Sequence, residues 1–130
     1  MTASIPVNIS PGELIDKITI LEIKLDHICD EKKITNIKLE LASLTQAYDE
    51  FIHISESLRT LSRHLKSVNK TLWNIEDDIR ECERHSDFSD TFVQLARSVY
   101  VTNDERARLK REINILLGSH LVEEKSYTAY

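Results

Sequence analysis

The sequence is poor in glycine and proline, with two residues of each type in a chain of 130. Pro6, Pro11 and Gly12 lie near the start, and Gly118 lies near the end. The long region 13–117 contains neither type, whereas average usage is about 12% for the two together. Turn-rich sandwiches and barrels are therefore poorly supported, and glycine-rich phosphate-binding loops are excluded.

Basic residues are not in excess either: the chain has 17 lysines and arginines and 22 acidic residues, so the net charge is −5. No clustered basic face is visible, which argues against a nucleic-acid partner. No apolar run approaches the roughly 18 residues of a membrane span, and residues 1–10 lack the features of a signal peptide. We expect a cytoplasmic protein with no membrane insertion.

Cysteine is scarce, and Cys29 and Cys82 are too few for a disulfide framework. The pairs His27-x-Cys29 and Cys82-x-x-His85 are a faint metal signal, because zinc sites usually show closer paired cysteines. We interpret Cys82, which lies on an apolar line, as a small core residue. No catalytic triad is recognisable, so we expect no metal, no cofactor and no catalytic residue.

Helical periodicity is what the sequence does contain. A helix is predicted from about residue 11. Ser10 is suited to the N-cap, Pro11 to the first helical position, and Glu13 can complete a capping box with Ser10. An apolar stripe at 4,3,4,3 spacing follows, formed by Leu14, Ile18, Leu21, Leu25 and Ile28. Ile20 and Ile23 fall on the opposite face. A helix that is apolar on two sides is central in a bundle or shared with a second subunit, and Ile20 and Ile23 are therefore candidate interface residues.

After a connection predicted at residues 29–35, a seven-residue repeat begins, formed by Ile37, Leu44, Phe51, Leu58, Leu65, Leu72 and Ile79. A second set of apolar residues lies three positions before the members of this repeat in its first half and three positions after them in its second half. The change falls within residues 53–57, where Ser55 or Ser57 can cap a new helix. One helix over residues 34–84 would be about 75 Å long. We prefer two helices with a turn at 53–57, and a continuous protruding coiled coil is the alternative.

Two further helices are predicted, a short one capped by Ser86 and Asp87 and a last one that stops at Gly118. A connection at residues 101–103 separates them. The predicted fold is a single all-α domain over residues 1–130, an antiparallel bundle of about five helices with long coiled-coil-like hairpins. Residues 1–9 form a short arm and residues 119–130 a tail.

One polar stripe on the predicted third helix combines Asn69, Trp73, Glu76 and Arg80 at helical spacing, and Trp73 is the only tryptophan. Aromatic and arginine side chains dominate binding hot spots, so this stripe is a candidate binding surface. The alternative is that Trp73 covers the edge of the core while Glu76 and Arg80 make an ordinary i,i+4 pair.

The last third of the chain is the most basic. Arg97 and Lys110, together with Arg80, could surround a small carboxylate or phosphate, or they could simply be solvated. Arg97 interrupts an otherwise apolar helix. If Arg97 is buried it needs an acidic partner, and Glu76 or Asp77 is the one expected.

Four segments resemble the signature segments of a family of short bacterial proteins that are nearly all of unknown function. They are SPGELIDKITILEIK from Ser10, NxxLWxIEDxIR from Asn69, LARSVYxxND from Leu95 and EEKSY from Glu123. The resemblance spans residues 5–127. It implies a helical fold and a bacterial or phage origin, it implies no activity, and it adds Asn103 and Lys125 to the candidate residues.

The sequence therefore leaves two hypotheses. The first is a non-enzymatic helical protein–protein interaction or scaffold protein that forms a homodimer. The second is a bundle that binds a small anion or metabolite, either as a binding protein or as an enzyme with a chorismate-mutase-like electrostatic pocket. Convergence of the candidate residues on one cleft would favour a ligand site; they are Asn69, Trp73, Glu76, Arg80, Arg97, Asn103, Lys110 and Lys125.

Overall fold

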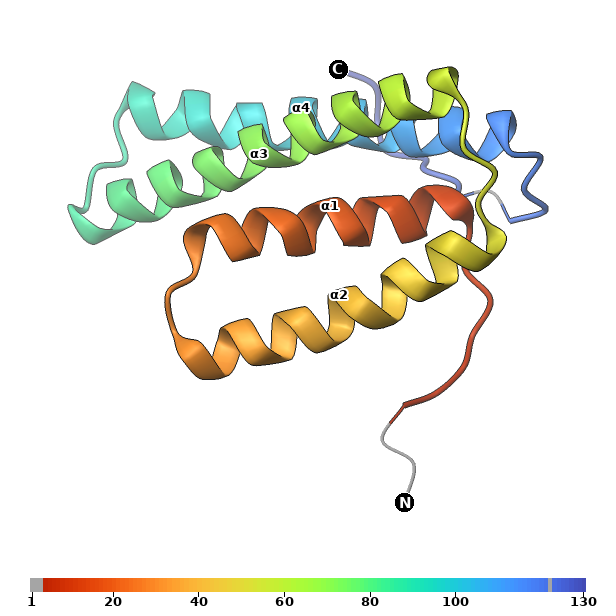
Figure 1. The fold of residues 1–130 in the computed structure, drawn as a ribbon. Coiled ribbons are helices and arrows are strands. Elements are labelled where there is room, and N and C mark those ends of the chain that lie inside the picture. The colour runs from red at the N-terminus through yellow and green to blue at the C-terminus, as the bar shows by residue number, and fades with distance from the viewer. Residues whose placement is uncertain (1–3, 122) are drawn as a thin grey trace.

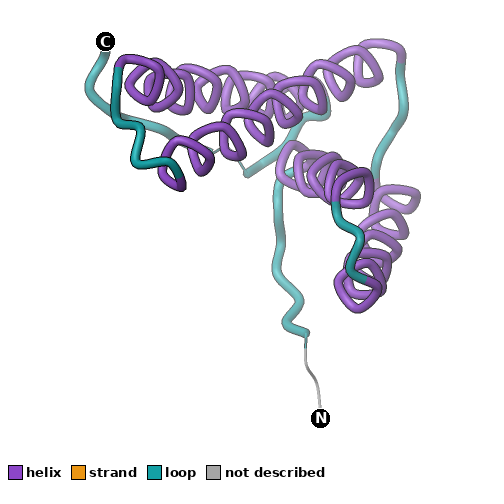
Figure 2. The backbone as a smooth tube through the Cα atoms, turned by 90° about the vertical axis from the view of Figure 1, so that its left-hand side faces the viewer, coloured by secondary structure: helices purple, strands orange, loops and turns teal. Residues whose placement is uncertain are grey.

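The structure, a computed structural model, describes residues 4–121 and 123–130. Within these residues the chain forms four helices and no strand, which confirms the all-α class and corrects the predicted number of helices. Figure 1 shows the antiparallel pair of α3 and α4 above α1, with α2 below; Figure 2, turned by 90°, places α2 on the far side of α1 from that pair. The helices are α1 (Pro11–His27), α2 (Glu31–Phe51), α3 (Glu56–Arg84) and α4 (Asp90–Leu116).

The start of α1 lies where the sequence predicts it. The hydroxyl of Ser10 accepts a hydrogen bond from the backbone N–H of Glu13 at 3.2 Å, and Pro11 begins the helix. The Glu13 carboxylate turns instead to the ammonium group of Lys110, 2.8 Å away. The reciprocal half of the predicted capping box is therefore replaced by a tertiary ion pair.

The repeat that begins at Ile37 is divided between two helices, as the change within residues 53–57 predicts. The chain leaves α2 after Phe51, and the Ser55 hydroxyl caps α3 by accepting from the N–H of Leu58 at 3.2 Å. The continuous coiled coil is therefore wrong. Phe51, although part of the repeat, is 75% exposed, whereas the nearby Tyr48 and Ile52 pack against the core.

The connection before α2 is shorter than the predicted range 29–35. Asp30 caps α2 by accepting from the N–H of Lys33 at 3.0 Å, so the helix begins at Glu31. The charged residues that interrupt the apolar pattern here are the exposed first turn of a helix. They do not form a loop.

The predicted connection at residues 101–103 is also wrong, since α4 runs through it without a break. Thr102, Asn103 and Asp104 look like a helix cap in the sequence. In the structure the Asp104 carboxylate accepts hydrogen bonds from Lys125 and Tyr130 and caps nothing. Without a glycine or proline to stop the helix, nothing local ends it here.

The turn that leads into α4 lies slightly later than the sequence predicts. Ser86 has a positive φ of 53°, and Asp87 accepts a hydrogen bond from the N–H of Ser89. Ser89 is the N-cap residue of α4, although its side chain makes no capping bond. At the other end Gly118, with a φ of 65°, ends α4 as predicted.

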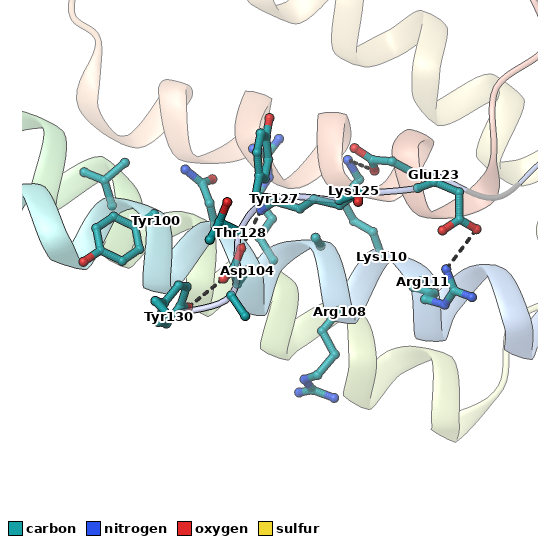
Figure 3. A pocket seen from close by; sticks show the side chains of 17 residues that line it. Tyr100, Asp104, Arg108, Lys110, Arg111, Glu123, Lys125, Tyr127, Thr128 and Tyr130 are labelled. Atoms are coloured by element: carbon teal, nitrogen blue, oxygen red, sulfur yellow. Dashed lines mark hydrogen bonds and ion pairs between the residues drawn. The ribbon is translucent and has the colours of Figure 1, made fainter.

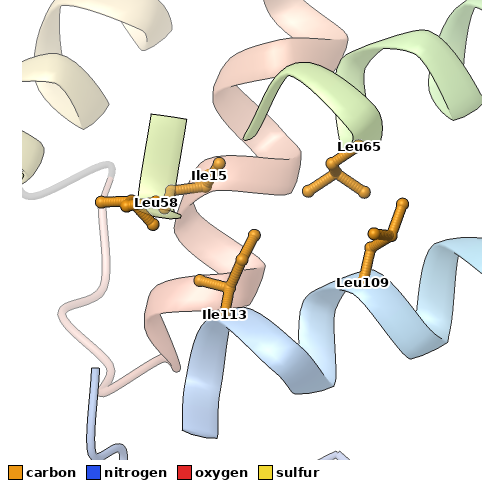
Figure 4. Packing of buried hydrophobic residues seen from close by; sticks show 5 residues of the cluster. All are labelled: Ile15, Leu58, Leu65, Leu109 and Ile113. Atoms are coloured by element: carbon orange, nitrogen blue, oxygen red, sulfur yellow. The ribbon is translucent and has the colours of Figure 1, made fainter. Parts of the chain in front are cut away.

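The hydrophobic core lies where α1, α3 and α4 meet. Figure 4 shows its five central side chains, Ile15, Leu58, Leu65, Leu109 and Ile113. Full burial of each contributes about 1.5–3 kcal/mol. Among the four described helices α2 packs only against α1, so it extends the bundle on one side without enclosing the core. Cys82 is buried, as expected for a core residue.

The first turn of α1 lies directly against the last turns of α4. The backbone N–H of Gly12 donates to the side-chain oxygen of Asn114 at 2.7 Å. A Cβ atom on Gly12 would lie 2.5 Å from the carbonyl oxygen of Lys110, which is closer than atoms can pack. Glycine is therefore required at this position by the helix crossing.

None of the four described helices is apolar enough over its length to cross a membrane.

Candidate functional site

Four polar side chains are packed together between α1, α3 and α4, and we call them the polar cluster: Asp16, Thr19, Asn69 and Arg106. Asp16 is 1% exposed and accepts hydrogen bonds from Nε and Nη2 of Arg106 at 2.9 and 2.5 Å. Asn69 uses both hydrogens of its Nδ2, donating to Asp16 Oδ1 and to Thr19 Oγ1 at 2.9 Å each. The Asp16 carboxylate raises the pKa of Arg106 above its usual value through these hydrogen bonds. Every member of the cluster therefore has its position fixed by another.

A cleft of about 510 Å³ opens beside the polar cluster, and we call it the central cleft. This volume lies within the range of small-molecule sites. One part of the lining is apolar and comes from α1 and α3, and the other is polar and comes from α3 and α4. The lining residues are Ile20, Ile23, Asn69, Leu72, Trp73, Glu76, Asp77, Arg80, Asn103 and Arg106.

Trp73 forms part of this lining, and its ring stacks on the ring of His27 with the centroids 4.9 Å apart. Its Nε1–H is buried and has no acceptor within the described residues. A buried donor without a partner costs about 1–3 kcal/mol. Because Nε1 is sealed from solvent, the Trp73 side chain presents carbon atoms to the central cleft.

A second hollow of about 1030 Å³ lies between α4 and the segment 123–130, and we call it the C-terminal groove. Figure 3 shows this segment running along α4. Asp104 holds it by accepting hydrogen bonds from Lys125 at 2.7 Å and from the Tyr130 hydroxyl at 2.6 Å. These two bonds lower the pKa of Asp104, and the bond to Asp104 raises the pKa of Tyr130.

Lys110 connects α4 with both ends of the chain. Its side chain is 8% exposed, and its ammonium lies 2.8 Å from carboxylate oxygens of Glu13 and of Glu123. Burial alone would lower the pKa of Lys110, but the hydrogen bonds to Glu123 and Glu13 outweigh it and the pKa is raised. Lys110 is therefore a structural cation whose charge is already compensated.

Most of the residues selected from the sequence are brought together. Five of the eight line the central cleft: Asn69, Trp73, Glu76, Arg80 and Asn103. The C-terminal groove takes Lys110 and Lys125 and shares Asn103 and Arg106 with the central cleft. Arg97 lines neither; it is exposed on α4 and so needs no buried partner.

The two candidate interface residues lie differently from what the sequence suggests. Ile23 is 1% exposed and is buried within the single chain, and Ile20 is half-buried at the central cleft. At Ile23 the second apolar face of α1 is covered within the chain, as expected for a helix that is central in a bundle, whereas at Ile20 it stays partly exposed. The interpretation of Ile23 as a spare face for a second subunit is therefore wrong.

Helical spacing did not predict the contact between Asp16 and Arg106, because these residues lie 90 positions apart. A weaker signal was present, since Asp16 lies in helical register with the buried Gly12, Thr19 and Ile23 and so falls on an inward face. Within the described residues no group of three or more histidine, cysteine or acidic side chains is arranged to hold a metal ion.

A protein family matches nearly the whole chain. A family described as being of unknown function, DUF6165, matches residues 5–130. The chain belongs to this family. No curated protein and no solved structure matches it. The function of this DUF6165 protein must therefore be argued from its own site.

Proposed function

We propose that this DUF6165 protein is a non-enzymatic binding protein whose central cleft holds a chemical group of a partner molecule. The supporting observation is that side chains from α1, α3 and α4 converge there, with carbon surface from Leu72 and Trp73 beside the polar Asn69 and Asn103. Apolar walls with a few placed polar groups are typical of binding sites.

The polar cluster beneath the central cleft strengthens this proposal. Burying an ion pair such as Asp16–Arg106 contributes little to stability, because the cost of removing both charges from water offsets their attraction. Apolar side chains would fill the same space without that cost. A buried polar network next to a cleft is therefore better explained by the need to hold Asn69 and Arg106 in fixed positions.

Binding fits this site better than catalysis does. The two arginines at the cleft are engaged, Arg106 with Asp16 and Arg80 with Glu76. General acid–base chemistry needs a group that can exchange a proton near the working pH, and a tightly paired arginine cannot. These pairs are suited to positioning a bound group.

Binding of a small anion has less support, because the candidate cations are compensated within the chain. Arg80 pairs with Glu76, Lys110 with Glu13 and Glu123, and Lys125 with Asp104. An anion would have to displace one of these carboxylates.

Trp73 offers a direct test, because as the only tryptophan it gives a single indole N–H signal in a ¹⁵N-labelled sample. We expect one or more members of a library of free amino acids, aliphatic amines, carboxylates and short peptides to shift this signal in a saturable way. The change Arg80→Gln should alter the affinity for such a compound, because it removes one of the charges that line the cleft. Arg97→Gln, an exposed arginine outside both hollows, is the matched control. The proposal fails if no compound shifts the indole signal, or if the two variants behave alike.

We further propose that the protein self-associates as a dimer through one end of the bundle. Phe51, Ile54 and Ile115 are exposed there, where α2 ends, α3 begins and α4 ends (Figure 1). Exposed apolar groups gathered in one place are typical of association surfaces. Light scattering coupled to gel filtration should give the mass of a dimer at about 100 μM, and Phe51→Ser should shift it towards the monomer. A monomer for the unaltered chain would refute this.

A further inference from the structure

The side chains that line the central cleft carry two negative and two positive charges, and the buried Asp16 beneath them leaves the site as a whole with one excess negative charge. Glu76 and Arg80 neutralise one another, and Arg106 is neutralised by Asp16 beneath it. This leaves Asp77, which is exposed and has no ion pair within the described residues. The net charge of −5 on the whole chain acts in the same direction. The cleft therefore attracts a cation and repels an anion.

A second, independent feature is a hydrogen-bond acceptor of fixed orientation at the wall of the cleft. Asn69 is 5% exposed and lines the cleft. Both hydrogens of its Nδ2 are used inside the polar cluster, by Asp16 and Thr19, which fixes the orientation of the amide. Its Oδ1 accepts no hydrogen bond within the described residues. The Asn69 oxygen is not among the buried polar atoms that lack a partner, so it is open to the cleft and can accept a hydrogen bond from a bound N–H group.

The remaining lining is suited to a hydrocarbon chain that carries such a donor. Ile20, Leu72 and the carbon surface of Trp73 provide apolar contacts from two helices. An ammonium group close to a tryptophan ring gains additional attraction from the ring electrons. An alkyl stem along these walls would leave its charged end to the oxygen of Asn69 and the carboxylate of Asp77.

From these features we infer that the central cleft binds a primary alkylammonium group. This inference rests on the binding function proposed above and specifies the chemistry of the ligand, which is an unbranched aliphatic stem of several carbons that ends in a protonated amine. Such a group is supplied either by a lysine side chain of a partner protein or by a free alkylamine. The recognition is the same for both, and the sources differ in whether a peptide backbone flanks the stem.

The test uses the full chain and follows the Trp73 indole signal during titration with three five-carbon probes, pentylamine, pentanol and pentanoate. We expect pentylamine to bind at least tenfold more tightly than the other two, with an affinity that falls as salt is added. Nα-acetyl-lysine-N-methylamide then distinguishes the sources. Tighter binding of this capped lysine indicates a lysine on a partner protein, and tighter binding of pentylamine indicates a free amine.

Two adjacent carboxylates give a matched pair of variants. Asp77→Asn removes the cleft carboxylate and should weaken pentylamine binding about fivefold to tenfold, whereas Asp78→Asn, which is exposed and outside the cleft, should leave it unchanged. Both positions are exposed, so loss of folding does not complicate the comparison.

Several results would overturn the inference: equal binding of pentanol or pentanoate, no response to pentylamine, or equal effects of the two variants. Preferred binding of pentanoate would overturn the ammonium assignment and leave the binding function intact. Failure of the whole compound library would instead overturn the binding function itself.

Discussion

Replacing Asp16 with asparagine tests whether the polar cluster holds α1 against α3 and α4. Asparagine keeps the shape of the side chain, but it removes the charge opposite Arg106 and replaces one acceptor oxygen by a donor. Removing one partner of a buried ion pair typically costs 3–5 kcal/mol. The Arg106 side chain is 30% exposed, so water can partly solvate the charge that is left. We therefore expect Asp16→Asn to lower the free energy of unfolding by about 2–3 kcal/mol.

Circular dichroism at 222 nm, followed during heating and during urea denaturation, measures this effect. For a chain of this length 2–3 kcal/mol corresponds to a fall in Tm of roughly 6–12 °C. The double variant Asp16→Asn/Arg106→Gln should be destabilised by less than the sum of the two single changes, since each single change leaves an unmatched partner.

An exposed ion pair provides the control for this experiment. Glu76→Gln breaks the pair with Arg80, whose side chains are both largely exposed, and should change the free energy of unfolding by less than about 0.5 kcal/mol. If Asp16→Asn costs no more than Glu76→Gln, or if the double-variant cycle shows no coupling, the polar cluster does not hold the helices together.

Two further predictions concern the ends of the chain. Gly12→Ala should destabilise the fold by about 1–3 kcal/mol, because the new methyl group meets the Lys110 carbonyl, and an unchanged urea midpoint would show that α1 and α4 do not cross so closely. The lowered pKa of Asp104 means that its bonds to the C-terminal segment are fully formed above the ordinary carboxyl value of about 3.9 and are lost as the pH falls through the lowered pKa. The raised pKa of Tyr130 means that the phenol keeps its proton, and so its bond to Asp104, past its ordinary value of about 10. NMR titration of the Tyr130 ring should show this raised pKa, and Asp104→Asn should return it to normal; the same titration curve in both proteins would contradict the contact.

The sequence predicted the features that depend on neighbouring residues. Ser10 and Ser55 cap helices because a hydroxyl oxygen reaches a backbone N–H three residues ahead, and Gly118 ends α4 because it accepts a positive φ. Asn69 and Trp73 could be placed on one side of α3 because residues four apart on a helix are neighbours. The same local logic failed at residues 101–103, where the polar residues resemble a cap but α4 continues, and the neighbouring Asp104 binds the C-terminal segment.

The contacts that decide the site join residues far apart in the chain. Asp16 and Arg106 are 90 positions apart, and Gly12 and Asn114 are 102 positions apart. Helical spacing places a side chain on one face of its own helix, but it carries no information about the helix that will pack there. The sequence by itself therefore determined an all-helical chain and the stripe that contains Trp73. Only the packing of α1 against α3 and α4 decided that this stripe borders a cleft, that Arg106 is paired with Asp16 beneath the cleft, and that Arg97 lies outside it.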